Sequence, residues 1–116
     1  MGVKLDRFTI ALLVLRPDAP RLAEQEANAL QDAHMSHLAD LHEAGQLLAA
    51  VPLLDPELRG LNIMKGTPDE ARSLLEQDPA VRIGRFTVKT IEWLVPAGAI
   101  QFARTQFPRS VVEVED

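Results

Sequence analysis

The chain has three histidines, and all of them fall in a stretch that predicts one long helix over residues 21–44. At about 100° per residue, His34 and His37 lie on the same side of this helix as Leu30 and Leu38, inside its apolar stripe. An unperturbed imidazole titrates at about pH 6.5, so a partly buried histidine can serve as a general base or acid. The alternative interpretation is a core histidine that is hydrogen-bonded to the backbone.

Asp78 is the carboxylate that we expect to act with His34. It lies between the second predicted helix and the last predicted strand, where the chain passes beside the first helix if both helices cover one face of a sheet. An aspartate hydrogen-bonded to one imidazole nitrogen fixes the tautomer and makes the other nitrogen more basic. Asp78-Pro79 can equally be only a helix terminator, because a residue before proline avoids the helical conformation.

Other chemistries have less support in the sequence. His34 and His37 have the i, i+3 spacing of a metal-binding pair, but a third ligand is not evident and the chain has no cysteine. Ser36 is adjacent to His37 and does not face it, and no nucleophile elbow, P-loop or dinucleotide fingerprint occurs. We therefore expect neither a metal nor a cofactor.

Two arginines are candidates for substrate binding, together with His37 as a pocket-lining residue. Arg59 and Arg85 could bind a carboxylate or an enolate, because a guanidinium offers paired donors to such groups. Ordinary surface ion pairs are the alternative role for both arginines.

The order of predicted elements defines the fold class. Hydrophobic patterns, Gly45 as a helix stop and a capping box from Thr67 to Glu70 predict strands at 8–15, 46–54, 58–65 and 85–95 and helices at 21–44 and 67–77. A shift in the apolar phase between Val88 and Ile91 suggests a bulge in the last strand. This β-α-β-β-α-β order predicts an α+β, ferredoxin-like fold, with a four-stranded antiparallel sheet and two helices on one face.

Length, charge and composition bound the remaining choices. The 116 residues make one domain, predicted at 1–96, with a C-terminal tail at 97–116. A net charge of −5 without a basic cluster argues against nucleic acid and anionic membranes as partners. The apolar run 8–15 is too short to cross a bilayer, and the absence of cysteine favours a cytoplasmic protein.

One sheet face would stay uncovered in this fold, because both helices lie on the other face. The apolar strand residues on that face predict a homodimer that packs sheet against sheet. The tail could then dock on the partner subunit, although a frayed terminus is also allowed.

Several of these residues resemble the YciI-like (YCII-related) family over about residues 8–100. The matching segments are the run from Gln31 to Pro52, Leu58-Arg59-Gly60, Asp78-Pro79, and Gly84-Arg85 with Trp93. The resemblance implies a dimeric α/β-barrel type of ferredoxin-like fold and a His/Asp active site, which falls here on His34 and Asp78. The family is similar in fold to muconolactone isomerases and to small cofactor-independent monooxygenases. Some relatives are assigned to elimination or isomerisation in aromatic degradation.

Two positions depart from the family pattern. Val51 stands where relatives usually have glycine before the proline, and His37 stands where they often carry another residue. We expect a small, cofactor-free, lyase- or isomerase-like enzyme in which His34, oriented by Asp78, moves a proton on a small organic substrate. The alternatives are a non-catalytic module that binds a small ligand in the same dimer pocket, and a cofactor-independent oxygenase.

Overall fold

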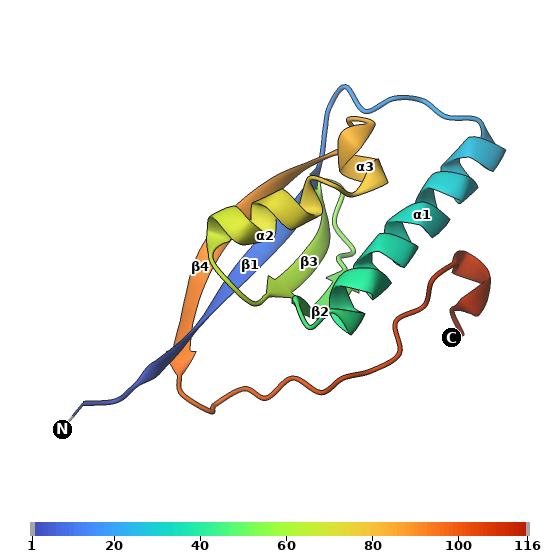
Figure 1. The fold of residues 1–116 in the computed structure, drawn as a ribbon. Coiled ribbons are helices and arrows are strands. Elements are labelled where there is room, and N and C mark those ends of the chain that lie inside the picture. The colour runs from blue at the N-terminus through green and yellow to red at the C-terminus, as the bar shows by residue number, and fades with distance from the viewer. Residues whose placement is uncertain (1, 116) are drawn as a thin grey trace.

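The computed structural model describes residues 2–115, so Met1 of the predicted domain and Asp116 of the predicted tail lie outside the described residues. The elements follow in the order β1 (Leu5–Leu15), α1 (Glu24–Glu43), β2 (Leu47–Pro52), β3 (Leu58–Met64), α2 (Pro68–Leu75), α3 (Pro79–Arg82), β4 (Phe86–Pro96) and the 3-10 helix η1 (Val111–Glu113). The four strands form one antiparallel sheet in the order β2-β3-β1-β4 (Figure 1). The predicted α+β class is confirmed, and the strand order is consistent with a ferredoxin-like arrangement. Between residues 2 and 115, no helix has the length and apolar character needed to cross a membrane.

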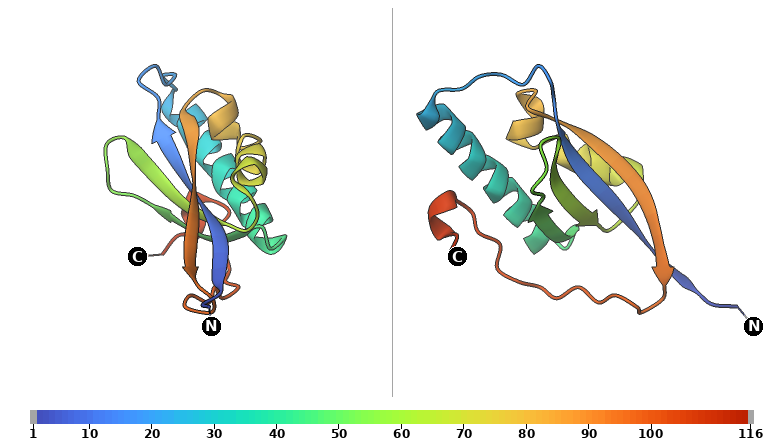
Figure 2. Two further views of the ribbon diagram at one scale, coloured as in Figure 1. Left: turned by 90° about the vertical axis from the view of Figure 1, so that its left-hand side faces the viewer. Right: turned by 180° about the vertical axis from the view of Figure 1, so that it is seen from behind.

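The helices α1, α2 and α3 lie on one face of the sheet (Figures 1 and 2). Alternate residues of β1, Thr9, Ala11 and Leu13, point to this face and are almost fully buried. They join a core that includes Leu41, Leu47, Met64, Leu75, Phe86 and Val88. The intervening residues of β1 point to the opposite face, which none of the helices in residues 2–115 covers (Figure 2).

Two local signals work as the sequence predicts. Gly45 ends α1 with a φ of 80°, a left-handed conformation that glycine adopts without strain. Thr67 caps α2, because its Oγ1 accepts a hydrogen bond of 3.2 Å from the amide of Glu70. The first helix begins at Glu24 and not at residue 21, because the backbone is still extended at the N-cap residue Ala23, with a ψ of 155°.

The prediction of a bulge in the last strand is wrong. The pairing of β4 with β1 is continuous from Leu5 opposite Pro96 to Leu15 opposite Phe86. The apolar phase changes because Phe86 and Val88 face the helices, whereas the next apolar residues, Ile91 and Trp93, face the opposite side of the sheet. The irregular pairings lie instead along β3, against β1 and β2.

The short helix α3 was not expected from the sequence. The sequence predicts a second helix to residue 77 with Asp78-Pro79 as a possible terminator, whereas in the structure this helix already stops at Leu75. Asp78 is the N-cap of α3 and Pro79 its first residue, a combination that favours a helix start.

The C-terminal segment, residues 97–115, runs from the end of β4 past β2 and along α1 of its own chain (Figure 1). Arg109 forms ion pairs with Asp40 and Glu43 at 2.9 and 3.1 Å, and the amide of Val111 donates to Asp32. Docking of this segment on a partner subunit stays a prediction.

Candidate active site

His34 and Asp78 come from different elements and meet beneath α3. Nδ1 of His34, in α1, forms a hydrogen bond with Oδ2 of Asp78 at the start of α3. The Asp78 side chain is 0% exposed and the His34 side chain 12% exposed. An ionised carboxylate can only accept, so Nδ1 of His34 is the donor, and in the neutral ring the lone pair lies on Nε2. This is the arrangement that a general base needs.

The second oxygen of Asp78 is also held. Its Oδ1 accepts a hydrogen bond of 2.8 Å from the amide of Ala80, which caps the first turn of α3. Both carboxylate oxygens therefore have a donor, as a buried carboxylate requires. The helix cap fixes the carboxylate, and the carboxylate in turn fixes the imidazole ring of His34.

The other end of α3 sets the start of β4. Gly84 has a φ of 86°, and its amide donates to the carbonyl of Val81. The next amide, that of Arg85, donates to the carbonyl of Ala80 at 3.1 Å. Ala80 thus bonds Asp78 through its amide and Arg85 through its carbonyl, so one short turn positions both residues.

Phe86 connects Arg85 to His34. The guanidinium carbon of Arg85 lies 5.1 Å from the centroid of the Phe86 ring, and the His34 ring lies 6.1 Å from the same centroid. Phe86 is only 7% exposed, so it forms a fixed platform between the two side chains. A cation and an imidazole with a free nitrogen therefore lie beside the same aromatic ring.

The other two predicted substrate-binding residues lie in different surroundings. Nε2 of His37 lies 3.0 Å from the carbonyl of Leu74 and, because a carbonyl only accepts, donates to it, which ties α1 to the end of α2. Arg59 is exposed in β3 at the sheet end where β4 begins, since Leu58 pairs with Val14. No hydrogen bond or ion pair within residues 2–115 joins Arg59 to His34 or Asp78.

His42, the third histidine of α1, is a further functional candidate. It is 4% exposed, and both of its ring nitrogens have backbone partners in Leu47 and Thr105. Its position just before the helix stop at Gly45 is the signal that indicates a contact with the following strand. The partner in the C-terminal segment, 63 residues away, has no local signal.

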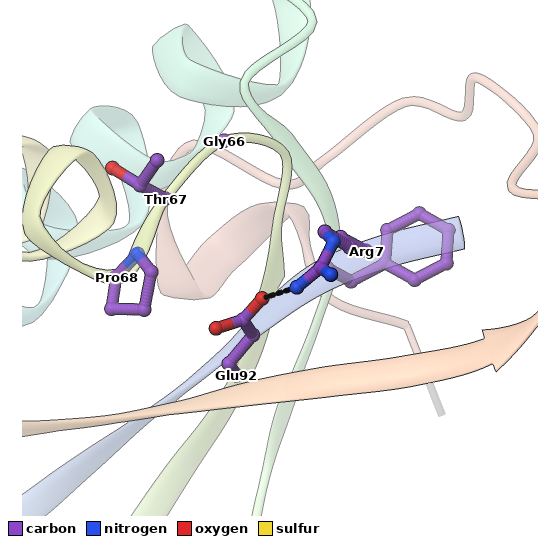
Figure 3. Close-up of a pocket in the computed structure, with 6 residues that line it drawn as sticks. Arg7, Gly66, Thr67, Pro68 and Glu92 are labelled. Atoms are coloured by element: carbon purple, nitrogen blue, oxygen red, sulfur yellow. Dashed lines mark hydrogen bonds and ion pairs between the residues drawn. The ribbon is translucent and has the colours of Figure 1, made fainter. Parts of the chain in front are cut away.

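Two hollows occur away from His34. One of about 220 Å³ is lined by Arg7, Phe8, Gly66, Thr67, Pro68 and Glu92, and Arg7 and Glu92 form an ion pair across it (Figure 3). The other, of about 260 Å³, lies between β2 and the C-terminal segment and is lined mainly by apolar residues. His34 and Asp78 line neither hollow.

Groups of three or more histidine, cysteine, aspartate or glutamate side chains placed to hold a metal ion do not occur within the part of the chain that the structure describes. The two histidines of the i, i+3 pair, His34 and His37, also have different hydrogen-bond partners. His34 turns to Asp78, and His37 turns to the carbonyl of Leu74.

Comparison with known proteins shows the family and the fold of the chain. The model of the YCII-related domain family matches residues 10–94, and the chain belongs to this family. Among solved structures, it is similar to 5-chloro-2-hydroxyhydroquinone dehydrochlorinase (TftG) from Burkholderia phenoliruptrix AC1100 in complex with 2,5-dihydroxybenzoquinone. The identity is 22% and the TM-score 0.53, over 74% of this chain and 90% of the other. At this identity the likeness shows the fold alone. No curated protein matches the chain.

Proposed function

We propose that this protein is a small enzyme that moves a proton on a small organic substrate, as a lyase or an isomerase does, without a cofactor. His34 is the base and Asp78 orients it. One observation carries the proposal: Nδ1 of His34 is committed to a fully buried carboxylate, which leaves Nε2 as the nitrogen that can take a proton.

The reaction class draws support from the similar solved structure, whose name describes the loss of HCl from a chlorinated hydroxyhydroquinone. Such an elimination removes a proton and a chloride ion from the substrate. The chlorine sits on a ring carbon, so the substrate first isomerises: a hydroxyl proton moves to that carbon, and the oxygen that lost it becomes a carbonyl. Nε2 of His34 then takes the proton of a second hydroxyl, the electron pair shifts through the ring, and chloride leaves with the electron pair of the carbon–chlorine bond, which gives a quinone. The imidazolium that forms is stabilised by the adjacent carboxylate of Asp78.

Arg85 is the residue that we propose for binding the substrate's negative oxygen. Its guanidinium lies over Phe86, the ring that also contacts His34. A hydroquinone that has lost a proton carries an anionic oxygen, which paired guanidinium donors bind well. His37 and Arg59 are proposed to contact the more distant parts of the substrate.

A homodimer is part of the proposal. Phe8, Ile10 and Leu12 of β1 and Ile91 and Trp93 of β4 share the sheet face that carries no helix. Packing this face on a second copy would remove the apolar side chains from water. A cytoplasmic location also stays a prediction and rests on the absence of cysteine.

Chloride release from 5-chloro-2-hydroxyhydroquinone tests the proposed reaction. His34→Asn is the matched variant, because the asparagine amide can still donate to Asp78 while the base at Nε2 is gone. We expect a loss of about 10²-fold or more in kcat with a nearly unchanged melting temperature. Arg85→Gln should raise KM more than it lowers kcat, and Leu54→Ala, at a fully exposed position, should change neither. Chloride release by His34→Asn at the wild-type rate would contradict the proposal.

A ligand-binding module without catalysis is the second candidate, and the apolar hollow of about 260 Å³ favours it. Leu48, Ala50, Phe102 and Phe107 are among its lining residues. Titration with 2,5-dihydroxybenzoquinone distinguishes the two functions. Amide shifts around His34 and Arg85, together with chloride release from 5-chloro-2-hydroxyhydroquinone, support the enzyme, whereas shifts confined to this hollow without chloride release support the module.

A further inference from the structure

His42 joins α1, β2 and the C-terminal segment. Nδ1 lies 2.7 Å from the carbonyl of Leu47, and Nε2 lies 3.0 Å from the amide nitrogen of Thr105. The ring of Phe107 stacks on the imidazole with centroids 4.0 Å apart and an angle of 13° between the planes. Three backbone or ring contacts therefore converge on a side chain that is almost fully buried.

These contacts fix the protonation state of His42. The backbone amide of Thr105 is a donor, so Nε2 must be the acceptor and carries no proton. The carbonyl of Leu47 is an acceptor, so Nδ1 must carry the proton. His42 is thus a neutral imidazole in the Nδ1–H tautomer, held from both sides.

A second proton would break this arrangement. It would sit on Nε2 and face the amide N–H of Thr105, so that two donors meet and the acceptor is lost. The cation would also be buried, and burying a charge without an opposite charge is unfavourable. The stack on Phe107 attracts a cation, but one aromatic face does not replace an acceptor and a hydration shell.

The charged groups around His42 do not supply the missing partner. In α1, the neighbouring carboxylate of Glu43 is paired with Arg109, which also binds Asp40. The C-terminal segment brings a further cation, Arg104, whose guanidinium donates to the carbonyl of Glu43. The strand β2, with the sequence Leu-Leu-Ala-Ala-Val-Pro, contributes no titratable side chain.

We propose that His42 is a proton-sensitive latch for the C-terminal segment. The neutral ring holds the segment at Thr105 and Phe107, and protonation releases residues 102–107 from β2 and the end of α1. Arg109 and Val111 keep their own contacts with α1, so the distal part of the segment stays attached to α1 when residues 102–107 are released. This inference is independent of the proposed enzyme function, because neither His34 nor Asp78 takes part.

Release would expose one defined surface. The hollow between β2 and the segment is lined by Leu48, Ala49 and Ala50 on one side and by Phe102, Ala103 and Phe107 on the other. Opening the latch separates these two walls. The change is therefore local, and the sheet and the helices keep their packing.

NMR spectroscopy of the full 15N-labelled chain tests the latch. Ring spectra of His42 should show the Nδ1–H tautomer at about pH 8, above the ordinary titration range of histidine. On acidification, the 15N heteronuclear NOE of residues 102–107 should fall by at least about twofold, with the midpoint of the His42 titration. The amide of Asn62, buried in β3, is the internal control and should stay rigid.

His42→Gln separates the latch from other effects of acid. A glutamine oxygen can accept from the amide of Thr105 but does not titrate, so the segment should stay ordered over the same pH range. An Nε2–H tautomer in the wild type would overturn the proposal, as would a segment that stays ordered while His42 becomes charged. A segment that loosens in His42→Gln at the wild-type midpoint would also overturn it. If His42→Gln loosens the segment at every pH, two observations on the wild type decide the question. These are the tautomer of His42, and whether the heteronuclear NOE of residues 102–107 falls with the same midpoint as the His42 titration.

Discussion

Asp78 combines two roles that the sequence presents as alternatives. It stands at a helix boundary, and its side chain also meets His34. One oxygen caps α3 and the other orients the imidazole, so the cap is the means by which the carboxylate is positioned. The predicted topology, which brings the segment before the last strand beside the first helix, suggested this pairing. The separation of His34 and Asp78 by 44 residues meant that only the folded chain could place them together.

Asp78→Asn should remove the base without removing the cap. The asparagine oxygen can still accept from the amide of Ala80, but its amide nitrogen then faces His34 as a donor. Nδ1 of His34 must become the acceptor, and its proton moves to Nε2. We expect kcat to fall on the order of 10²- to 10⁴-fold, with little change in melting temperature. An active variant with the wild-type tautomer would contradict this account.

Asp55 predicts how the stability of the folded protein changes with pH. Its Oδ2 accepts from the amides of Glu57 and Leu58, and these hydrogen bonds hold the pKa of the carboxyl below its ordinary value of 3.8. A lowered pKa in the folded state stabilises the protein above the ordinary value, and this contribution is lost as the pH falls through the folded value. Asp55→Asn should therefore melt below the wild type at about pH 7 and approach it in acid. If the difference in melting temperature between Asp55→Asn and the wild type widened in acid, the prediction would be contradicted.

At the scale of the elements, local rules predicted the end of α1 and the start of α2, but not the regular pairing of the last strand. The Thr67 cap and the Gly45 stop depend on neighbouring residues, and both occur as expected. The bulge in the last strand was wrong because a change of apolar phase also arises when a regular strand changes the face it buries. The helix α3 was missed because Asp78-Pro79 was considered only as an end, although the same pair favours a start.

Gly84 gives a prediction at this scale, with Gly45 as its matched control. Both glycines have a positive φ, and a Cβ added at either would meet no atom within 4 Å. Gly84→Ala and Gly45→Ala should each cost about 1–2 kcal/mol through backbone strain alone. Only Gly84→Ala should lower kcat/KM, since Gly84 precedes Arg85 and Phe86. Equal losses of activity in both variants would argue against positioning by α3. Denaturant unfolding measures the stability and chloride release the activity.

At the scale of the whole molecule, the path of the long C-terminal segment is a feature without a local sequence signal. Phe102 packs against Phe8 with centroids 5.3 Å apart, and Phe8 in turn lies near Trp93. These contacts join residues far apart in the sequence. Alternating strand residues predicted that one face would be apolar, and the structure shows that no helix in residues 2–115 covers it (Figure 2).

The open face predicts the oligomeric state. Sedimentation at micromolar concentration should give twice the chain mass of 12.8 kDa. Ile10→Asp, between Ile63 and Ile91 on this face, should give a monomer, because a dimer would have to bury a carboxylate beside apolar cross-strand neighbours. Leu54→Asp, at a fully exposed residue, should remain a dimer. A wild-type monomer, or an Ile10→Asp dimer of unchanged affinity, would rule out this interface.

The central claim is that Asp78 leaves Nε2 of His34 free to accept a proton, and the ring 15N spectrum of His34 tests it most directly. We predict a neutral Nδ1–H tautomer at about pH 8, above the ordinary titration range of histidine. Adding 2,5-dihydroxybenzoquinone should shift the Nε2 signal of His34 and leave its Nδ1–H bond in place. An Nε2–H tautomer, or a ring spectrum that the ligand does not change at saturating concentration, would contradict the claim.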